Sequence, residues 1–178
     1  EAASGRIIMR CDADDFYVAD RIAWQVEWLD RHSEFGAVCG SFESTDHTGR
    51  CVAELNTQST AEEITEELKE GKTRTHLCCF AILAASLEKT GGCRDYFVLG
   101  SDLDLQTRIG EVMRVWFEPR VSYRYRLHDQ SITHAEADVC RRFFQETVVL
   151  FAQQRRAQGQ DDLQRGCPPS PPEGQHDA

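Results

Sequence analysis

Apolar residues recur along the chain at two different spacings, which predicts strands and helices in alternation. Apolar runs and period-two alternation predict strands at 6–11, 36–42, 51–55, 115–119 and 121–127. Spacings of three and four residues predict helices at 19–31, 61–71, 103–113 and 135–154. The most apolar stretch, Leu77 to Leu87, is interpreted as a buried strand that runs into a short helix.

This alternation indicates an α/β protein, in which helices flank a sheet. The chain has 178 residues, enough for one domain followed by a tail. We expect one domain over 1–156. Residues 157–178 are predicted to be a disordered tail, because they are polar and contain four of the five prolines.

The balance of charged residues limits the kinds of ligand that the chain is expected to bind. The chain has 20 Lys and Arg against 30 Asp and Glu, a net charge of −10, and no basic patch, which argues against nucleic acid. An acidic chain binds phosphate through a metal ion or a few local Arg residues.

The eight cysteines contain no C-x-x-C pair, so zinc spacing is absent. We interpret them as reduced thiols in a cytoplasmic protein. There is no signal peptide and no apolar run long enough to span a bilayer.

Two acidic clusters are candidates for chemistry. Asp12, Asp14 and Asp15 follow the first predicted strand, and Asp102 and Asp104 open a predicted helix. Carboxylates are preferred ligands of Mg²⁺ and Mn²⁺, and strand alternation sends Asp12 and Asp14 to the same side. Ligands of α/β sheets gather at the carboxyl ends of strands, where the first cluster lies. A solvated acidic turn is the alternative interpretation.

Two further segments leave alternatives open. Asp102 precedes a helix, where a carboxylate is either a helix cap or a general base. In YRYRLH, Arg126 is suited to pair with phosphate and His128 to bind a metal. The alternative is a half-exposed strand with extended Arg side chains and a structural His. Gly91 and Gly92 are typical of a turn.

The order of these motifs carries more information than any one of them. DADD, GGCRDYF, SDLDLQTRI and YRYRLH, followed by SIT, resemble in succession the family 2 glycosyltransferases of the inverting GT-A type. The resemblance covers roughly residues 5–133. It implies a Rossmann-like mixed sheet flanked by helices and a metal-assisted inverting transfer of sugar to an acceptor hydroxyl.

The resemblance also implies roles for individual residues. Asp12 and Asp14 match the D-x-D pair that binds Mn²⁺ or Mg²⁺, which holds the donor diphosphate, and His128 matches a third contact to the metal or phosphate. Asp102 matches the catalytic base. Asp104 and Arg108 match the structural part of that motif, and Gly91 and Gly92 the turn on the acceptor side. The residues expected to contact substrate are Asp12, Asp15, Gly91, Gly92, Arg94, Asp104 and Arg126.

The implied partners are a UDP- or GDP-linked sugar and a glycan or lipid acceptor. The implied location is the cytoplasm, at the inner face of the membrane, with peripheral association only.

The chain departs from the family pattern in two places. Ser101 stands where Glu usually precedes the base, and the opening strand of the nucleotide-binding lobe is missing. We expect this chain to be incomplete at its N-terminus, to bind nucleotide-sugar poorly alone and to expose a sheet edge. The alternatives are another metal-dependent phosphoryl or nucleotidyl transferase, or a non-catalytic interaction module of the same fold.

Overall fold

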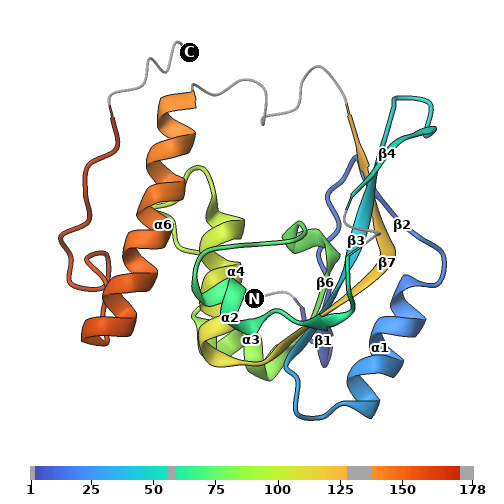
Figure 1. The fold of residues 1–178 in the computed structure, drawn as a ribbon, viewed down its shortest axis with the longest axis horizontal. Coiled ribbons are helices and arrows are strands. Elements are labelled where there is room, and N and C mark those ends of the chain that lie inside the picture. The colour runs from blue at the N-terminus through green and yellow to red at the C-terminus, as the bar shows by residue number, and fades with distance from the viewer. Residues whose placement is uncertain (1–2, 56–58, 128–137, 173–178) are drawn as a thin grey trace.

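A curled, mixed seven-stranded sheet forms the centre of the computed structural model, which describes residues 3–55, 59–127 and 138–172 (Figure 1). The strands are β1 (Ile7–Ile8), β2 (Phe16–Tyr17), β3 (Ala37–Thr45), β4 (Cys51–Leu55), β5 (Glu62–Glu63), β6 (Phe80–Leu83) and β7 (Val115–Arg126). The helical elements are α1 (Arg21–Arg31), α2 (Thr65–Lys69), the 3₁₀ turn η1 (Leu77–Cys79), α3 (Ala84–Thr90), α4 (Ser101–Val112) and α6 (Asp138–Gln158). The predicted α/β sheet with flanking helices is confirmed.

The strand directions bring three carboxyl ends to one edge of the sheet. The order is β1-β6-β3-β7-β2, with β4 paired to β3 and β5 to β7. Strands β3 and β7 are parallel, while β6 is antiparallel to both β3 and β1. Therefore β1 runs in the same direction as β3 and β7, and the DADD segment after β1 lies at the edge where β3 and β7 also end.

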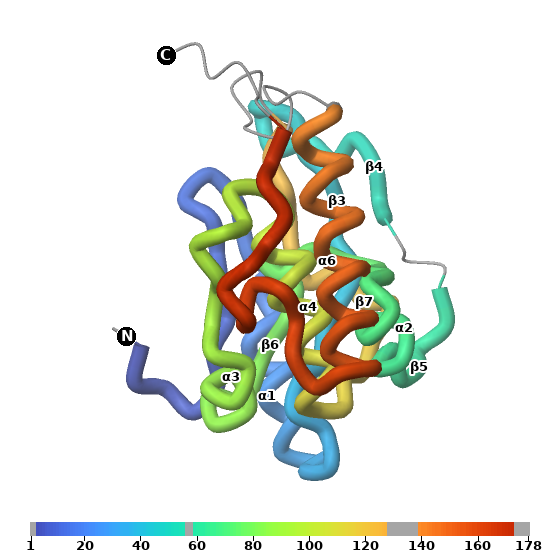
Figure 2. The backbone as a smooth tube through the Cα atoms, turned by 90° about the vertical axis from the view of Figure 1, so that its left-hand side faces the viewer, coloured from blue at the N-terminus to red at the C-terminus, as the bar shows by residue number. Residues whose placement is uncertain are grey.

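Strand alternation divides the core between the two faces of the sheet. Ala37 and Cys39 of β3 pack with residues of α2 and α4, whereas Val38 packs with Trp24 and Leu29 of α1. Figures 1 and 2 show α1 on one face and α2, α3 and α4 on the other, with α6 beyond them. The buried strand followed by a short helix, predicted at Leu77–Leu87, is confirmed as η1, β6 and α3.

The segment after α6 is ordered as far as the structure describes it. Leu163 packs with Phe144 and Phe151 of α6, and the hydroxyl of Tyr96 donates to the carbonyl of Pro169 at 2.7 Å. Asp161 is fully buried. Composition predicts disorder for 157–178, whereas the described part of this segment, 157–172, makes an ion pair and an apolar contact that composition does not reveal.

Pro119 does not divide β7, contrary to the two predicted strands. Gly40 pairs with Glu118 and Ser41 with Val121, so Pro119 and Arg120 form an irregularity in the pairing of β7 with β3. Proline has no backbone N–H, and at this irregularity none is needed for a hydrogen bond to β3. Gly40 is required opposite it, because a Cβ there would lie 2.6 Å from the carbonyl oxygen of Arg120.

Two local predictions differ in extent from the structure. The strand at 6–11 is confined to Ile7–Ile8, and the helix at 61–71 is the short strand β5 followed by α2. The side chain of Asp20 does not cap α1, because it pairs with Arg120 instead.

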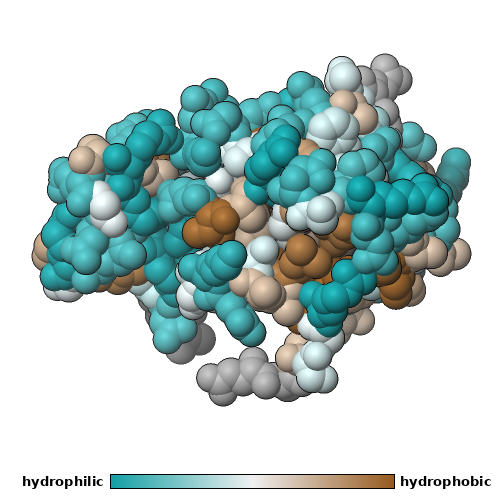
Figure 3. All heavy atoms as spheres, turned by 90° about the horizontal axis from the view of Figure 1, so that it is seen from below, coloured by the Kyte–Doolittle hydropathy of each residue, from teal (hydrophilic) through white to brown (hydrophobic). Residues whose placement is uncertain are grey.

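No helix within the described part of the chain is both long and apolar enough to cross a membrane. Figure 3 shows a mostly hydrophilic face, with some apolar atoms reaching the surface near its middle.

Close packing of α2 on α4 leads to the first prediction. Gly110→Ala places a Cβ 2.7 Å from Leu68 Cβ and 3.0 Å from the carbonyl oxygen of Thr65. Alanine favours a helix by about 1 kcal/mol over glycine, but overpacking against backbone costs about 1–3 kcal/mol. We expect a net loss of stability in urea denaturation. Gly5→Ala is the control, since its Cβ meets only an ordinary contact at 3.5 Å; equal stability of both variants would contradict the prediction.

Candidate functional site at the carboxyl edge of the sheet

The DADD loop is attached to β7 by one tyrosine. The backbone N–H of Asp12 donates to the hydroxyl of Tyr123 at 3.0 Å, and that hydroxyl donates to Oδ2 of Asp15 at 2.8 Å. The ring is buried, and desolvation raises the pKa of Tyr123 well above its usual value, so the hydroxyl remains a donor. The contact fixes the loop over the carboxyl ends of β1 and β7.

Asp15 holds the loop in place. Its side chain is buried, Oδ2 accepts from Tyr123, and Oδ1 accepts from the backbone N–H of Arg126 at 2.8 Å. Both oxygens thus have a structural role, and the predicted substrate contact of Asp15 stays a prediction.

Asp12 and Asp14 remain accessible. Asp14 is exposed and Asp12 partly so. Oδ1 of Asp12 accepts from Nε of Arg10 at 2.7 Å, and Oδ2 accepts from the thiol of Cys78 at 3.4 Å. Burial raises the pKa of Cys78 to about 12, so this thiol stays protonated as a donor.

These two carboxylates fit a hard cation that takes its other ligands from phosphate and water. The described residues of the DADD loop do not form a ready three-ligand cluster; the cluster of that kind in the described chain is Glu43, Cys51 and Glu54 on β3 and β4. A cation bound at the loop would therefore take the rest of its coordination shell from phosphate and water oxygens. Asp12 must also exchange its Arg10 partner to bind one.

The second acidic segment opens α4. Gly100 stands before the helix in the left-handed conformation, with φ of 70°, and Asp102 lies in the first turn. Asp102 is therefore not the N-cap residue. Its side chain is partly exposed, which leaves it accessible to a ligand.

The two acidic segments converge around Arg10 and His76. Desolvation lowers the pKa of Arg10, but its hydrogen bond to Asp12 and the charges of Asp12, Cys78 and Asp102 together raise it. The charge of Asp102 also acts on His76, together with those of Asp15 and Asp12. The charges of both acidic segments thus reach the same cation and the same imidazole.

His76 is a site residue that the sequence did not identify. Its ring lies 4.4 Å from that of Phe42, edge to face, and 5.6 Å from that of Tyr125, stacked. Desolvation lowers its pKa although the nearby carboxylates oppose this, so the neutral imidazole is favoured. No described residue hydrogen-bonds to its ring nitrogens. Position 76 carries no motif signal, because its neighbours come from distant strands.

Asp104 and Arg94 belong to a buried ion-pair network. Asp104 is 0% exposed and its carboxylate pairs with Arg94 and with Arg108, whose NH2 group lies at 2.7 Å. Arg94 also pairs with Asp161 at 2.6 Å, and Arg155 pairs with Asp161 and Glu111. These contacts give Asp104 and Arg94 a structural role in the buried network, and their substrate-binding roles stay predictions.

The remaining predicted residues lie as follows. Gly91 and Gly92 both have positive φ at the end of α3, with open space beside them, which confirms the turn. The guanidinium of Arg126 lies 4.7 Å from the Phe16 ring centroid, and its buried Nε has no hydrogen-bond partner in the described chain. His128 lies outside the described residues.

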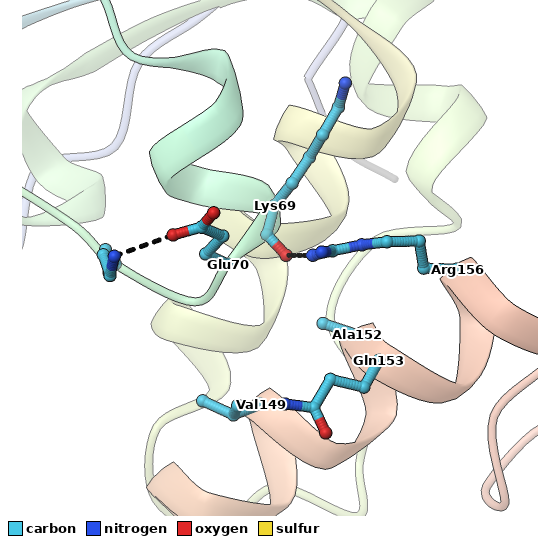
Figure 4. Close-up of a pocket in the computed structure, with 7 residues that line it drawn as sticks. Lys69, Glu70, Val149, Ala152, Gln153 and Arg156 are labelled. Carbon is cyan, nitrogen blue, oxygen red and sulfur yellow. Dashed lines mark hydrogen bonds and ion pairs between the residues drawn. The ribbon is translucent and has the colours of Figure 1, made fainter.

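A separate cavity of about 310 Å³ lies between α2 and α6 (Figure 4). Its cationic groups already have partners: Lys69 pairs with Glu66, Lys72 pairs with Glu70, and Arg156 donates to the Lys69 carbonyl. We do not assign the functional site to it.

Crystal structures of TarS from S. aureus have the same fold. TarS 1–349 in complex with UDP-GlcNAc matches with a TM-score of 0.66 at 12% identity, over 85% of this chain and 44% of that chain. TarS 1–349 matches with a TM-score of 0.55 at 13% identity, over 89% of this chain and 50% of that chain. TarS 1–349 in complex with UDP matches with a TM-score of 0.54 at 14% identity, over 88% of this chain and 50% of that chain. No protein-family model and no curated protein sequence matches.

At these identities the likeness shows the fold alone. The chain spans half or less of the length of the TarS chains that it matches.

The buried network gives a second prediction. Asp104→Asn leaves the charges of Arg94 and Arg108 without their shared partner, so we expect a loss of about 3–5 kcal/mol in urea denaturation. Glu146→Gln is the control, because its pair with Arg142 is exposed and should have little effect. A variant as stable as the wild type would show that Asp104 is not required by the fold.

The environment of His76 gives a third prediction, which concerns how stability depends on pH. Its folded pKa lies below its usual value of 6.5, so the unfolded state binds the proton more readily. As the pH falls from about 7.5 to about 5.5, the wild type should lose more stability than His76→Gln. Urea midpoints at the two pH values measure the difference, and NMR titration gives the pKa directly. A pKa at or above 6.5 would contradict this assignment.

Proposed function

We propose that this chain forms the catalytic part of a metal-assisted, inverting sugar transferase. It takes a sugar from a nucleotide-sugar donor and transfers it to an acceptor hydroxyl. A UDP-linked donor is the first choice because TarS, which has the same fold, binds UDP-GlcNAc and UDP.

The observation that carries the proposal is the convergence of two acidic segments at one edge of a glycosyltransferase fold. Asp12 and Asp102 are far apart in sequence, yet both act on Arg10. Two accessible carboxylates near each other suit a reaction with two ends: a leaving group that gains charge and a nucleophile that loses a proton.

Asp12 and Asp14 are the residues that would hold Mn²⁺ or Mg²⁺ at the donor end. The bound cation would neutralise the charge of the diphosphate. Arg126 ends β7 next to the loop, since its backbone N–H donates to Asp15, and its guanidinium is proposed to pair with a phosphate oxygen. His128 remains a proposed third contact.

Asp102 is the proposed base at the acceptor end. Its carboxylate takes the proton of the acceptor hydroxyl while that oxygen bonds to the anomeric carbon. The bond from this carbon to the donor phosphate breaks on the opposite face, and the nucleoside diphosphate leaves with the bonding electrons. One displacement inverts the configuration, with an acceptor hydroxyl in the place of the water used by inverting glycosidases.

The acceptor side is proposed to include the Gly91-Gly92 turn, where the absence of side chains lets a substrate approach the backbone. The exposed imidazole of His76 and the half-buried ring of Tyr125 that stacks on it complete it. We propose a glycan or lipid-linked acceptor, with the protein located in the cytoplasm at the inner face of the membrane.

Asp102→Asn tests the base assignment. The amide keeps the shape of the side chain but cannot take a proton, so kcat for UDP release from the accepted UDP-sugar should fall about a hundredfold or more. The donor KM should change little, because the metal-binding carboxylates are intact. The assay uses the protein that carries this chain, with Mn²⁺ and a panel of UDP- and GDP-sugars.

Asp30→Asn is the matched control, since Asp30 is an exposed residue of α1 that pairs with Arg6. It should keep wild-type turnover. Near-wild-type turnover by Asp102→Asn would remove the base assignment. If the wild type releases nucleotide from none of the sugars tested, the transferase proposal itself fails.

A further inference from the structure

Arg10 is a cationic group at the centre of the candidate site that the sequence motifs do not include. It follows β1 and precedes Asp12 by two residues. Its Nε donates to Oδ1 of Asp12 at 2.7 Å. The two side chains are 53% and 37% exposed, so solvent reaches the pair.

Arg10 is therefore in direct contact with Asp12, the proposed ligand of the cation that holds the donor diphosphate.

We propose that Arg10 is a phosphate-binding residue of the donor site, which pairs with Asp12 in the free protein and exchanges this partner for the donor diphosphate when a divalent cation takes Asp12. This inference rests on the proposed function, because it assumes that Asp12 and Asp14 bind the cation.

The strengths of the interactions favour this exchange. Exposed ion pairs contribute little to stability, so the Arg10–Asp12 pair is easily broken. A divalent cation competes directly with the guanidinium for the same carboxylate oxygen and, once bound, repels it. The released guanidinium has a planar fork of donors that matches two phosphate oxygens. Arg10 thereby keeps the carboxylate of Asp12 paired until the donor arrives.

The test measures two affinities that should change in opposite directions. Arg10→Gln removes the competitor of the cation, so titration calorimetry with Mn²⁺ alone should show binding about threefold tighter or more. UDP titrated in saturating Mn²⁺ should bind about tenfold more weakly or worse, because a charge-assisted phosphate contact is lost. Arg10→Lys keeps the charge but lacks the fork, so it should bind Mn²⁺ like the wild type and UDP more weakly.

Arg31→Gln is the control, because Arg31 forms an exposed pair with Glu27 on α1 and should change neither affinity. Asp14→Ala shows which Mn²⁺ signal belongs to the site. The exposure of Arg10 makes a folding defect unexpected, and thermal unfolding of each variant checks this.

The outcomes separate this inference from the function on which it rests. Weaker Mn²⁺ binding by Arg10→Gln would show that Arg10 positions Asp12 rather than competing for it, and would overturn the exchange. Unchanged UDP affinity would overturn the phosphate contact. In both cases an Asp14-dependent Mn²⁺ site would leave the proposed function in place. If neither the wild type nor Arg10→Gln binds Mn²⁺ through Asp14, the metal site and the exchange fail together.

Discussion

The buried hydroxyl of Tyr123 bonds to two residues of the loop after β1, and the geometry of the candidate site depends on it. Tyr123 belongs to β7, which is parallel to β3 in the sheet centre. Through Asp15 and the N–H of Asp12, the sheet fixes the loop's direction. Because Asp15 also accepts the N–H of Arg126, the loop and the end of β7 move together. The accessible residues Asp12 and Asp14 are thus held in place by the buried Asp15.

The acidic residues separate into two groups according to burial. Asp15 and Asp104 are buried and their oxygens are used by Tyr123, backbone or Arg side chains. Asp12 and Asp102 are partly exposed and share electrostatic partners. Burying a carboxylate requires partners for its charge, and those partners give Asp15 and Asp104 a structural role. The same local motifs, D-x-D-D and S-D-x-D, therefore supply both structural and candidate chemical residues.

The network around Asp104 connects the site to the outer layer of the molecule. Arg94 follows the Gly91-Gly92 turn and bonds both to Asp104 of α4 and to Asp161 beyond α6. The N-terminus of α4, which carries Asp102, is thereby braced against α6 and the segment that follows it. This accounts for the order of a segment whose composition is typical of disorder. Catalytic groups need such rigid support if they are to keep a productive geometry.

The sequence by itself determined the type and order of most elements, the turn at Gly91-Gly92 and the acidic segments, because periodicity and turn chemistry are local properties. Only the tertiary structure decided which aspartates are accessible, that β7 continues through Pro119, and that the charges of both acidic segments act on His76 and Arg10. Burial and charge pairing depend on residues brought together from distant strands. A window of sequence shows which groups a site can contain, whereas packing fixes which of them keep a free oxygen or nitrogen for a ligand.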